Sequence, residues 1–214
     1  LGGSREDFSE DTSSFKVPCV IVTTSAENWS MEELSSVSID DEKAGETIVD
    51  YLIDHGHTKI AEIGANLELS QTAILRHNGY LNSFKKHGIT PDERYYEKAR
   101  FSYDSAYHAM KKLLEKDIEI TAVYAISDVM AIGAIRAILD KGLRVPDDIS
   151  ITGFDGSTLA EYYNPKIVSI RQPHKDMAAH SVELLFSMID LHKGSCHEII
   201  PFELTEGESV ARIN

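Results

Sequence analysis

The chain has 214 residues, 42% of them hydrophobic, with 35 acidic and 21 basic residues and a formal net charge of −14. This length and composition suffice to bury the core of one domain or of two small lobes. So strong a negative charge would repel a phosphate backbone, so these residues are not expected to bind DNA themselves. The sequence has neither a long apolar run that could span a membrane nor a signal peptide at its start, and we therefore expect a cytoplasmic protein.

Short β-branched runs alternate with amphipathic helical stretches, a pattern typical of parallel sheets joined by crossover helices. The predicted strands are 17–23, 36–39, 59–63, 122–126, 149–153, 167–170 and 199–204. The predicted helices cover about 44–55, 70–87, 104–114, 127–141 and 175–192. The fourth helix is apolar around most of its circumference, so it must be covered on more than one side. Only one strand precedes the first crossover, and a lone strand is not a sheet, so we expect part of the first lobe to be missing.

The two cysteines lie far apart in the sequence. Cys19 is inside the apolar run 17–22, and Cys196 follows the last predicted helix. Two buried thiols in a reducing compartment are the favoured interpretation, and a single disulfide remains open as the alternative.

Polar and aromatic residues follow the predicted strands, at the edge where open α/β sheets bind ligands. They are Asp40, Asp41, Ser70, Thr72, Arg76, Phe101, Ser127, Asp128 and Asp155. A carboxylate and a guanidinium can each hold vicinal hydroxyl groups, and a ring can cover the apolar face of a sugar. The set therefore predicts a small polyhydroxylated ligand. The structural alternative is that Asp128 and Asp155 cap turns and helices and that Arg76 forms a surface ion pair.

At this point the sequence resembles the LacI-type (lactose/galactose repressor) transcription regulators along nearly its whole length. The order and spacing of several blocks carry the resemblance. They include Val37-Ser38-Ile39-Asp40-Asp41, Arg76-His77-Asn78-Gly79-Tyr80, Leu143-Arg144-Val145-Pro146, Gly153-Phe154-Asp155 and Ile170-Arg171-Gln172-Pro173.

The resemblance implies an α/β, periplasmic-binding-protein-like (type I) fold of two Rossmann-like lobes with parallel sheets, joined by three crossings of the chain. It assigns residues 1–34 and 170–193 to an incomplete N-terminal lobe. Residues 35–169 and 194–214 are assigned to the C-terminal, effector-binding lobe. The effector is expected in the cleft between the lobes.

The resemblance also implies which residues bind the effector. Arg76 and Asp155 match the family's two most regular contacts, Phe101 matches its cleft aromatic residue, and Ser70 and Thr72 match positions that contact effector in some members. Ser127 stands where the family usually has asparagine, so a hydroxyl contact replaces an amide there. Two further departures, Arg100 before Phe101 and Gly156 after Asp155, also concern the identity of the effector.

The implied function is effector sensing for a DNA-binding regulator, with no cofactor. The expected partners are a small molecule, in particular a carbohydrate, operator DNA through a head outside this chain, and a second copy of the protein in a homodimer. Effector binding would change DNA affinity by linkage, because the effector prefers one arrangement of the lobes. A periplasmic sugar-binding protein of a transport system shares the fold and is the main alternative.

An enzyme is the third interpretation, and the motifs do not support it. The sequence has no Gly-x-Ser-x-Gly elbow, no phosphate-binding Gly-Lys-Ser/Thr loop and no Cys-x-x-Cys. His55 and His57 flank Gly56 and could together bind a metal ion, but a histidine beside a glycine cap at a helix end is the ordinary role. We therefore expect neither catalytic residues nor a metal.

Overall fold

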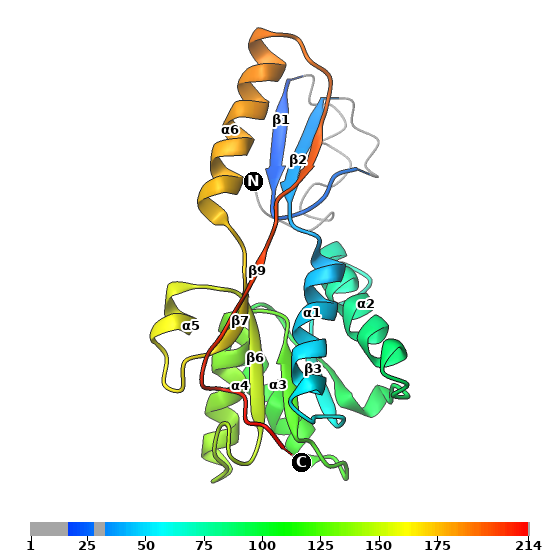
Figure 1. The fold of residues 1–214 in the computed structure, drawn as a ribbon, viewed down its shortest axis with the longest axis vertical. Coiled ribbons are helices and arrows are strands. Elements are labelled where there is room, and N and C mark those ends of the chain that lie inside the picture. Colours follow the sequence, from blue (N-terminus) through cyan, green and yellow to red (C-terminus); the bar gives the residue numbers. More distant parts are fainter. Residues whose placement is uncertain (1–16, 28–32, 214) are drawn as a thin grey trace.

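The protein folds into two lobes of unequal size stacked along one axis (Figure 1). The structure, a computed structural model, describes residues 17–27 and 33–213. The smaller lobe contains a parallel sheet in the order β1-β2-β8, formed by Cys19–Val22, Leu34–Ser38 and His197–Ile199. Helix α6, His174–Asp190, packs against β1 and β2.

The larger lobe is built on a six-stranded sheet in the order β4-β3-β5-β6-β7-β9. Its strands are β3 (Ile60–Gly64), β4 (Tyr96–Lys98), β5 (Ala122–Ala125), β6 (Ser150–Asp155), β7 (Val168–Arg171) and β9 (Glu203–Thr205). All neighbouring pairs are parallel except β7 and β9, which are antiparallel. The central strands are buried throughout, as expected for a sheet covered on both faces.

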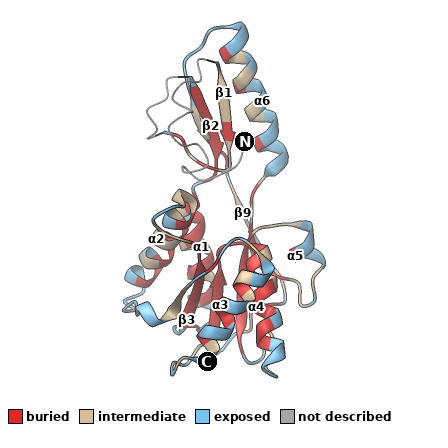
Figure 2. Ribbon diagram, turned by 180° about the vertical axis from the view of Figure 1, so that it is seen from behind, coloured by how far each residue is buried: buried red, intermediate tan, exposed pale blue. Residues whose placement is uncertain are grey.

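Two pairs of helices cover this sheet, α1 with α2 on one face and α3 with α4 on the other (Figures 1 and 2). They are α1 (Asp41–Asp54), α2 (Gln71–Lys86), α3 (Tyr103–Glu115) and α4 (Asp128–Asp140). The short α5 (Thr158–Tyr162), which was not predicted, contacts α4. Helix α4 is buried over most of its surface, which confirms the expectation that it is covered on more than one side. No helix among the described residues is both long and apolar enough to cross a membrane.

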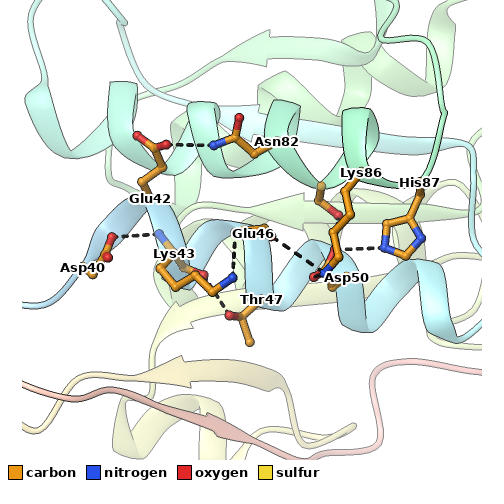
Figure 3. Close-up of polar contacts among 10 residues, drawn as sticks. Asp40, Glu42, Lys43, Glu46, Thr47, Asp50, Asn82, Lys86 and His87 are labelled. Atoms are coloured by element: carbon orange, nitrogen blue, oxygen red, sulfur yellow. Dashed lines mark hydrogen bonds and ion pairs between the residues drawn. The ribbon is translucent and has the colours of Figure 1, made fainter.

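Helices α1 and α2 approach each other closely because each has a glycine at the contact. A methyl group on Gly45 would lie 2.7 Å from the carbonyl oxygen of Arg76, and one on Gly79 would collide with the backbone of α1. Polar side chains bridge the pair on its outer side (Figure 3). Asp50 of α1 accepts hydrogen bonds of 2.6 Å from both Ser83 and Lys86 of α2. The close contact fixes where the side chains of α2 point.

The chain crosses between the lobes three times, as the resemblance implies, but the predicted boundaries are wrong. The predicted boundary at 34/35 divides β2, yet every residue of β2 pairs within the small sheet, 34–37 with β1 and 36–38 with β8. Strand β8, assigned to the large lobe, pairs with β2, and β7, assigned to the small lobe from residue 170, pairs with β6 to Arg171. The crossings therefore follow β2, β7 and β8. The part of the predicted small lobe at 1–16 and 28–32 lies outside the described residues.

The predicted strand 199–204 is also corrected. It is divided between β8 of the small sheet and β9 of the large sheet, with Pro201 between them. Proline has no N–H group to donate to a sheet, so the chain leaves one ladder there and joins the other. The cysteines are both free, with Cys196 exposed and Cys19 half-buried, so the expectation of two buried thiols is wrong for Cys196.

Candidate functional site

A cavity of about 1080 Å³ opens between the two lobes. The large lobe contributes residues that follow β3, β4, β6 and β7 together with the first turns of α2, and the small lobe contributes residues after β1 and the start of α6. The lining residues used below are Thr23, Asn66, Ser70, Gln71, Thr72, Arg76, Lys98, Arg100, Phe101, Asp155, Gln172 and His174. The site thus lies at the carboxyl edge of both sheets, where α/β proteins bind ligands.

Arg76 is the buried cation of the site. Its residue surface is only 3% exposed, its Nε donates a hydrogen bond of 2.8 Å to Asp41, and its Nη1 donates one of 2.6 Å to the carbonyl oxygen of Ile126. The guanidinium lies 3.5 Å from the centre of the Phe154 ring, a cation–π contact. Burial raises the pKa of Asp41, against the lowering effect of the Arg76 charge. The proposed surface ion pair of Arg76 is therefore wrong, because this pair is buried.

Asp155 is the carboxylate of the site and ends strand β6. Its Oδ1 accepts a 2.7 Å hydrogen bond from Gln172 and lies 3.8 Å from Nη1 of Arg76. Burial raises the pKa of Asp155 to about 6. The positive charge of Arg76 acts against this shift, and the negative charge of Asp128 adds to it. Its backbone has a φ of 105°, a conformation that is strained for any residue but glycine. Such strain is concentrated at functional sites.

Phe101, Ser70 and Thr72 complete the predicted set that the structure brings together. Phe101 lines the cavity and is 48% exposed, which leaves its ring available to a ligand. Ser70 begins α2, and its hydroxyl accepts a hydrogen bond of 3.2 Å from the N–H of Ala73. That hydroxyl can still donate its own proton, because a serine hydroxyl has one donor and two acceptor positions.

Ser127 is not part of the cavity, so its assignment as a ligand contact is corrected. It is buried, and its hydroxyl caps α4 by accepting a hydrogen bond of 3.4 Å from the N–H of Met130. The neighbouring Asp128 accepts hydrogen bonds of 2.6 Å from the hydroxyl of Ser169 and from the N–H of Ser157. The structural role considered for Asp128 is therefore the one it has, whereas Asp155 makes no such cap.

Several lining residues were missed in the sequence. Thr23 follows β1 and has a φ of 73°, which is unusual for a β-branched residue. Gln172 and His174 follow β7, and Asn66 follows β3. Ligands bind at the carboxyl ends of parallel strands, and this rule predicted Asp155. Applied to β1 and β7, the same rule predicts Thr23 and Gln172.

The cavity offers a guanidinium, a carboxylate, hydroxyl groups and an aromatic ring to a ligand, and among its described residues Ser70 and Ser105 accept hydrogen bonds from backbone N–H groups. Among the described residues no cluster of three histidine, cysteine or acidic side chains could hold a metal ion. His57 uses both ring nitrogens in hydrogen bonds of 3.1 Å to Thr121 and 3.0 Å to Ala211, so neither is free for a metal. Two lobes, three crossings and a cavity between them with polar, charged and aromatic lining residues define a two-lobed α/β architecture with an interlobe cavity.

Comparison with known proteins gives the family. The periplasmic binding protein-like domain matches residues 49–210, and the chain belongs to that family. It is 38% identical to the HTH-type transcriptional regulator MalR of Clostridium butyricum over all of this chain and 64% of that protein. The chain spans less than two thirds of the length of MalR and of the other curated regulators that it matches.

Solved structures agree. The transcriptional regulator CelR in complex with cellobiose has 30% sequence identity and a TM-score of 0.81, over 89% of this chain and 58% of that one. A LacI family regulator from Enterococcus faecium with bound ribose has 25% identity and a TM-score of 0.82, over 92% and 72% of the two chains. These structures confirm the type of fold expected from the sequence.

Proposed function

We propose that this chain is the effector-sensing region of a bacterial transcription regulator and that it binds a saccharide in the cavity between its lobes. The observation that carries the proposal is that Arg76, Phe101 and Asp155 line a single cavity. The guanidinium and the carboxylate hold hydroxyl groups, and the exposed ring covers an apolar sugar face. The saccharide complexes of CelR and of the Enterococcus faecium regulator support a carbohydrate as the ligand class.

The cavity couples ligand binding to the arrangement of the lobes. Thr23 and His174 belong to the small lobe, whereas Arg76 and Asp155 belong to the large one. A ligand that contacts both sets favours the arrangement in which they lie closest together. If DNA prefers a different arrangement of the lobes, the ligand lowers the affinity of the protein for DNA. By thermodynamic linkage, DNA lowers the affinity for the ligand by the same factor.

DNA contact is assigned to a part of the protein outside these residues, because a net charge of −14 opposes binding to a phosphate backbone. The relatives MalR and CelR are named as transcriptional regulators, which favours this role over that of a periplasmic transport protein or an enzyme. A regulator of transcription acts where the chromosome is, so we place the protein in the cytoplasm.

A homodimer is the expected assembly. Exposed apolar side chains occur on α3, α4 and α5, which are neighbours because α4 contacts both others. These side chains are Tyr103, Leu139, Leu159 and Tyr162, the last with 80% of its surface exposed. Burying them in an interface is favourable by about 25 cal/mol for each square ångström of apolar surface. Replacing Leu159 and Tyr162 with aspartate is expected to convert a dimer to a monomer in light scattering.

The test of the proposed function uses the full-length protein and a fluorescently labelled fragment of its own upstream region. We expect DNA binding, measured by anisotropy, to change when a matching saccharide is added. The Asp155→Asn variant should bind the same DNA with the same affinity but fail to respond to the saccharide. DNA binding that no saccharide changes, or a variant that responds like the natural protein, would reject the proposal.

A further inference from the structure

Two basic side chains lie on one wall of the cavity. Lys98 ends strand β4 and Arg100 follows it, and neither forms an ion pair with any described residue. The nearest acid in sequence, Glu97, is already paired with Lys116 at 2.9 Å. Both side chains line the cavity, so their charges are available to an anionic group of a ligand.

The start of α2 adds positive potential to the same part of the cavity. Ser70, Gln71 and Thr72 line it, and the first turn of α2 contains no acidic residue, whereas α1 begins with Asp41 and Glu42. The N-terminus of a helix carries a partial positive charge that favours anions. Lys98 lies next to this region, because β4 pairs with β3 and Lys98 is opposite Gly64.

The opposite end of the cavity has a different chemistry. Asp155 is the only acid among the described lining residues. Beside it Gln172 is only 5% exposed, and its Oε1 is buried with no hydrogen-bond partner among the described residues. A buried acceptor without a donor is costly, so this end is suited to ligand hydroxyl groups that donate to Gln172 and Asp155.

Measured along the backbone, the two ends of the cavity are farther apart than the width of one sugar ring. The strand order β4-β3-β5-β6 places three interstrand steps between Lys98 and Asp155, or about 14 Å at about 4.8 Å a step. The cavity volume of about 1080 Å³ is slightly above the usual range for ligand sites, about 300–1,000 Å³. Both values favour a ligand of two sugar rings.

We propose that the effector is a phosphorylated disaccharide. One ring is held by its hydroxyl groups at Arg76, Asp155 and Gln172, and a phosphate monoester on the other ring is bound by Lys98, Arg100 and the start of α2. A phosphate dianion matches two cations better than a single carboxylate does, and its oxygens accept several hydrogen bonds. The inference rests on the proposed function and specifies the ligand of that same cavity.

Calorimetry on the full-length protein tests the inference. The probes are maltose, cellobiose and trehalose, each as the free sugar and as its 6-phosphate, with glucose 6-phosphate and cellobiouronic acid as the shorter and the carboxylate ligands. We expect one disaccharide phosphate to bind at least about tenfold more tightly than its free sugar and than either control ligand. Its affinity should fall as the salt concentration rises, because opposite charges are screened.

A matched pair of variants locates the effect. In Lys98→Met/Arg100→Met the preference for the phosphorylated sugar over the free one should fall to near one. Lys141→Met removes an exposed positive charge outside the cavity and should keep that preference. A free disaccharide that binds as tightly as its phosphate, or a preference unaffected in the double variant, would overturn the inference while leaving a saccharide-binding regulator intact. Tighter binding of cellobiouronic acid than of any phosphate would also overturn it.

Discussion

The side chain of Arg76 donates a hydrogen bond of 2.8 Å to Asp41, and both side chains are at most 4% exposed. This pair links α2 to the start of α1 below the cavity floor. Arg76 therefore serves two roles, since it also lies 3.8 Å from Asp155 and faces the ligand space. Its removal affects the fold as well as the site.

We predict that Arg76→Met lowers the free energy of unfolding by about 3 kcal/mol, because the variant leaves the carboxylate of Asp41 buried without its partner. Urea denaturation at neutral pH measures the loss. The double variant Arg76→Met/Asp41→Asn should recover a large part of it, since the remaining buried group is uncharged. Equal stability of the single variant and the natural protein would contradict the buried ion pair.

Asp155→Asn is predicted to weaken ligand binding by about 2 kcal/mol without a loss of stability. Because the pKa of Asp155 is raised to about 6, the folded state binds its proton more readily than the unfolded state, and the charged carboxylate destabilises the fold above that pH. Removing the charge at pH 7.5 should raise the unfolding free energy by up to about 1 kcal/mol, after allowance for solvent screening. Asparagine and aspartate adopt positive φ values with similar frequency, so the substitution should add no backbone strain at this position.

Thermal melts and calorimetry on the same preparation measure both effects. A variant that melts at a lower temperature would indicate that Asp155 is a structural residue. Unchanged binding would remove it from the site.

Ligand affinity should also depend on pH. The ionised carboxylate of Asp155 accepts hydrogen bonds from ligand hydroxyl groups, and with a pKa of about 6 it is largely protonated at pH 5. We expect binding of an uncharged saccharide to be about tenfold weaker at pH 5 than at pH 8, with the midpoint near pH 6. In Asp155→Asn the affinity should vary little over this range. An equally steep pH profile in the variant would assign the effect to another group.

A second pH effect concerns stability. Nδ1 of His77 lies 2.7 Å from Oε2 of the buried Glu62. Burial acts to lower the pKa of His77, but the hydrogen bond and charge of Glu62 outweigh it, and the net shift is upward. A raised histidine pKa contributes stability that is complete below about pH 6.5 and is lost as the pH rises through the folded value.

We therefore expect the unfolding free energy to decrease as the pH rises above about 6.5. His77→Gln should flatten that decrease, and His108→Gln, a change at an exposed histidine of α3, should not. Denaturation curves at several pH values measure the slope. Identical slopes in all three proteins would contradict a charged pair of His77 and Glu62.

The close contact of α1 and α2 gives a further prediction. Gly79→Ala should destabilise the protein by about 1–3 kcal/mol, because the new methyl group meets the backbone of α1 and the helices must separate. Asn78→Ala, at the preceding position of the same helix, is the control and should have a much smaller effect. Separation of the helices would also displace Arg76, so ligand affinity should fall in the glycine variant alone. A fully stable Gly79→Ala protein would show that the contact is looser than described.

The residues of the site could be predicted where their position after a strand determines whether they reach the cavity. Arg76, Phe101 and Asp155 follow strands of one sheet, and the carboxyl ends of parallel strands meet at one edge, so their convergence in one cavity follows from the order of elements. Ser127 obeys the same rule and yet lies outside the cavity. Its hydroxyl is used at the start of α4, and the direction of a capping side chain is set by the helix it caps.

The division into lobes was harder to predict for a physical reason. Strands β2 (LSSVS) and β8 (HEI) are short and mostly polar, so their sequences do not reveal which sheet they join. Pro201 is the local signal that was available, since it separates β8 from β9. Long-range pairing, such as that of β2 with β8, decides the rest.

A crystal structure of the full-length protein with its tightest-binding saccharide tests the central claim most directly. We predict density for the ligand between the lobes, with hydroxyl groups within hydrogen-bond distance of Arg76 and Asp155 and a ring against Phe101. Ligand density at another place on the protein, with the cavity of these three residues filled only by water, would contradict the account.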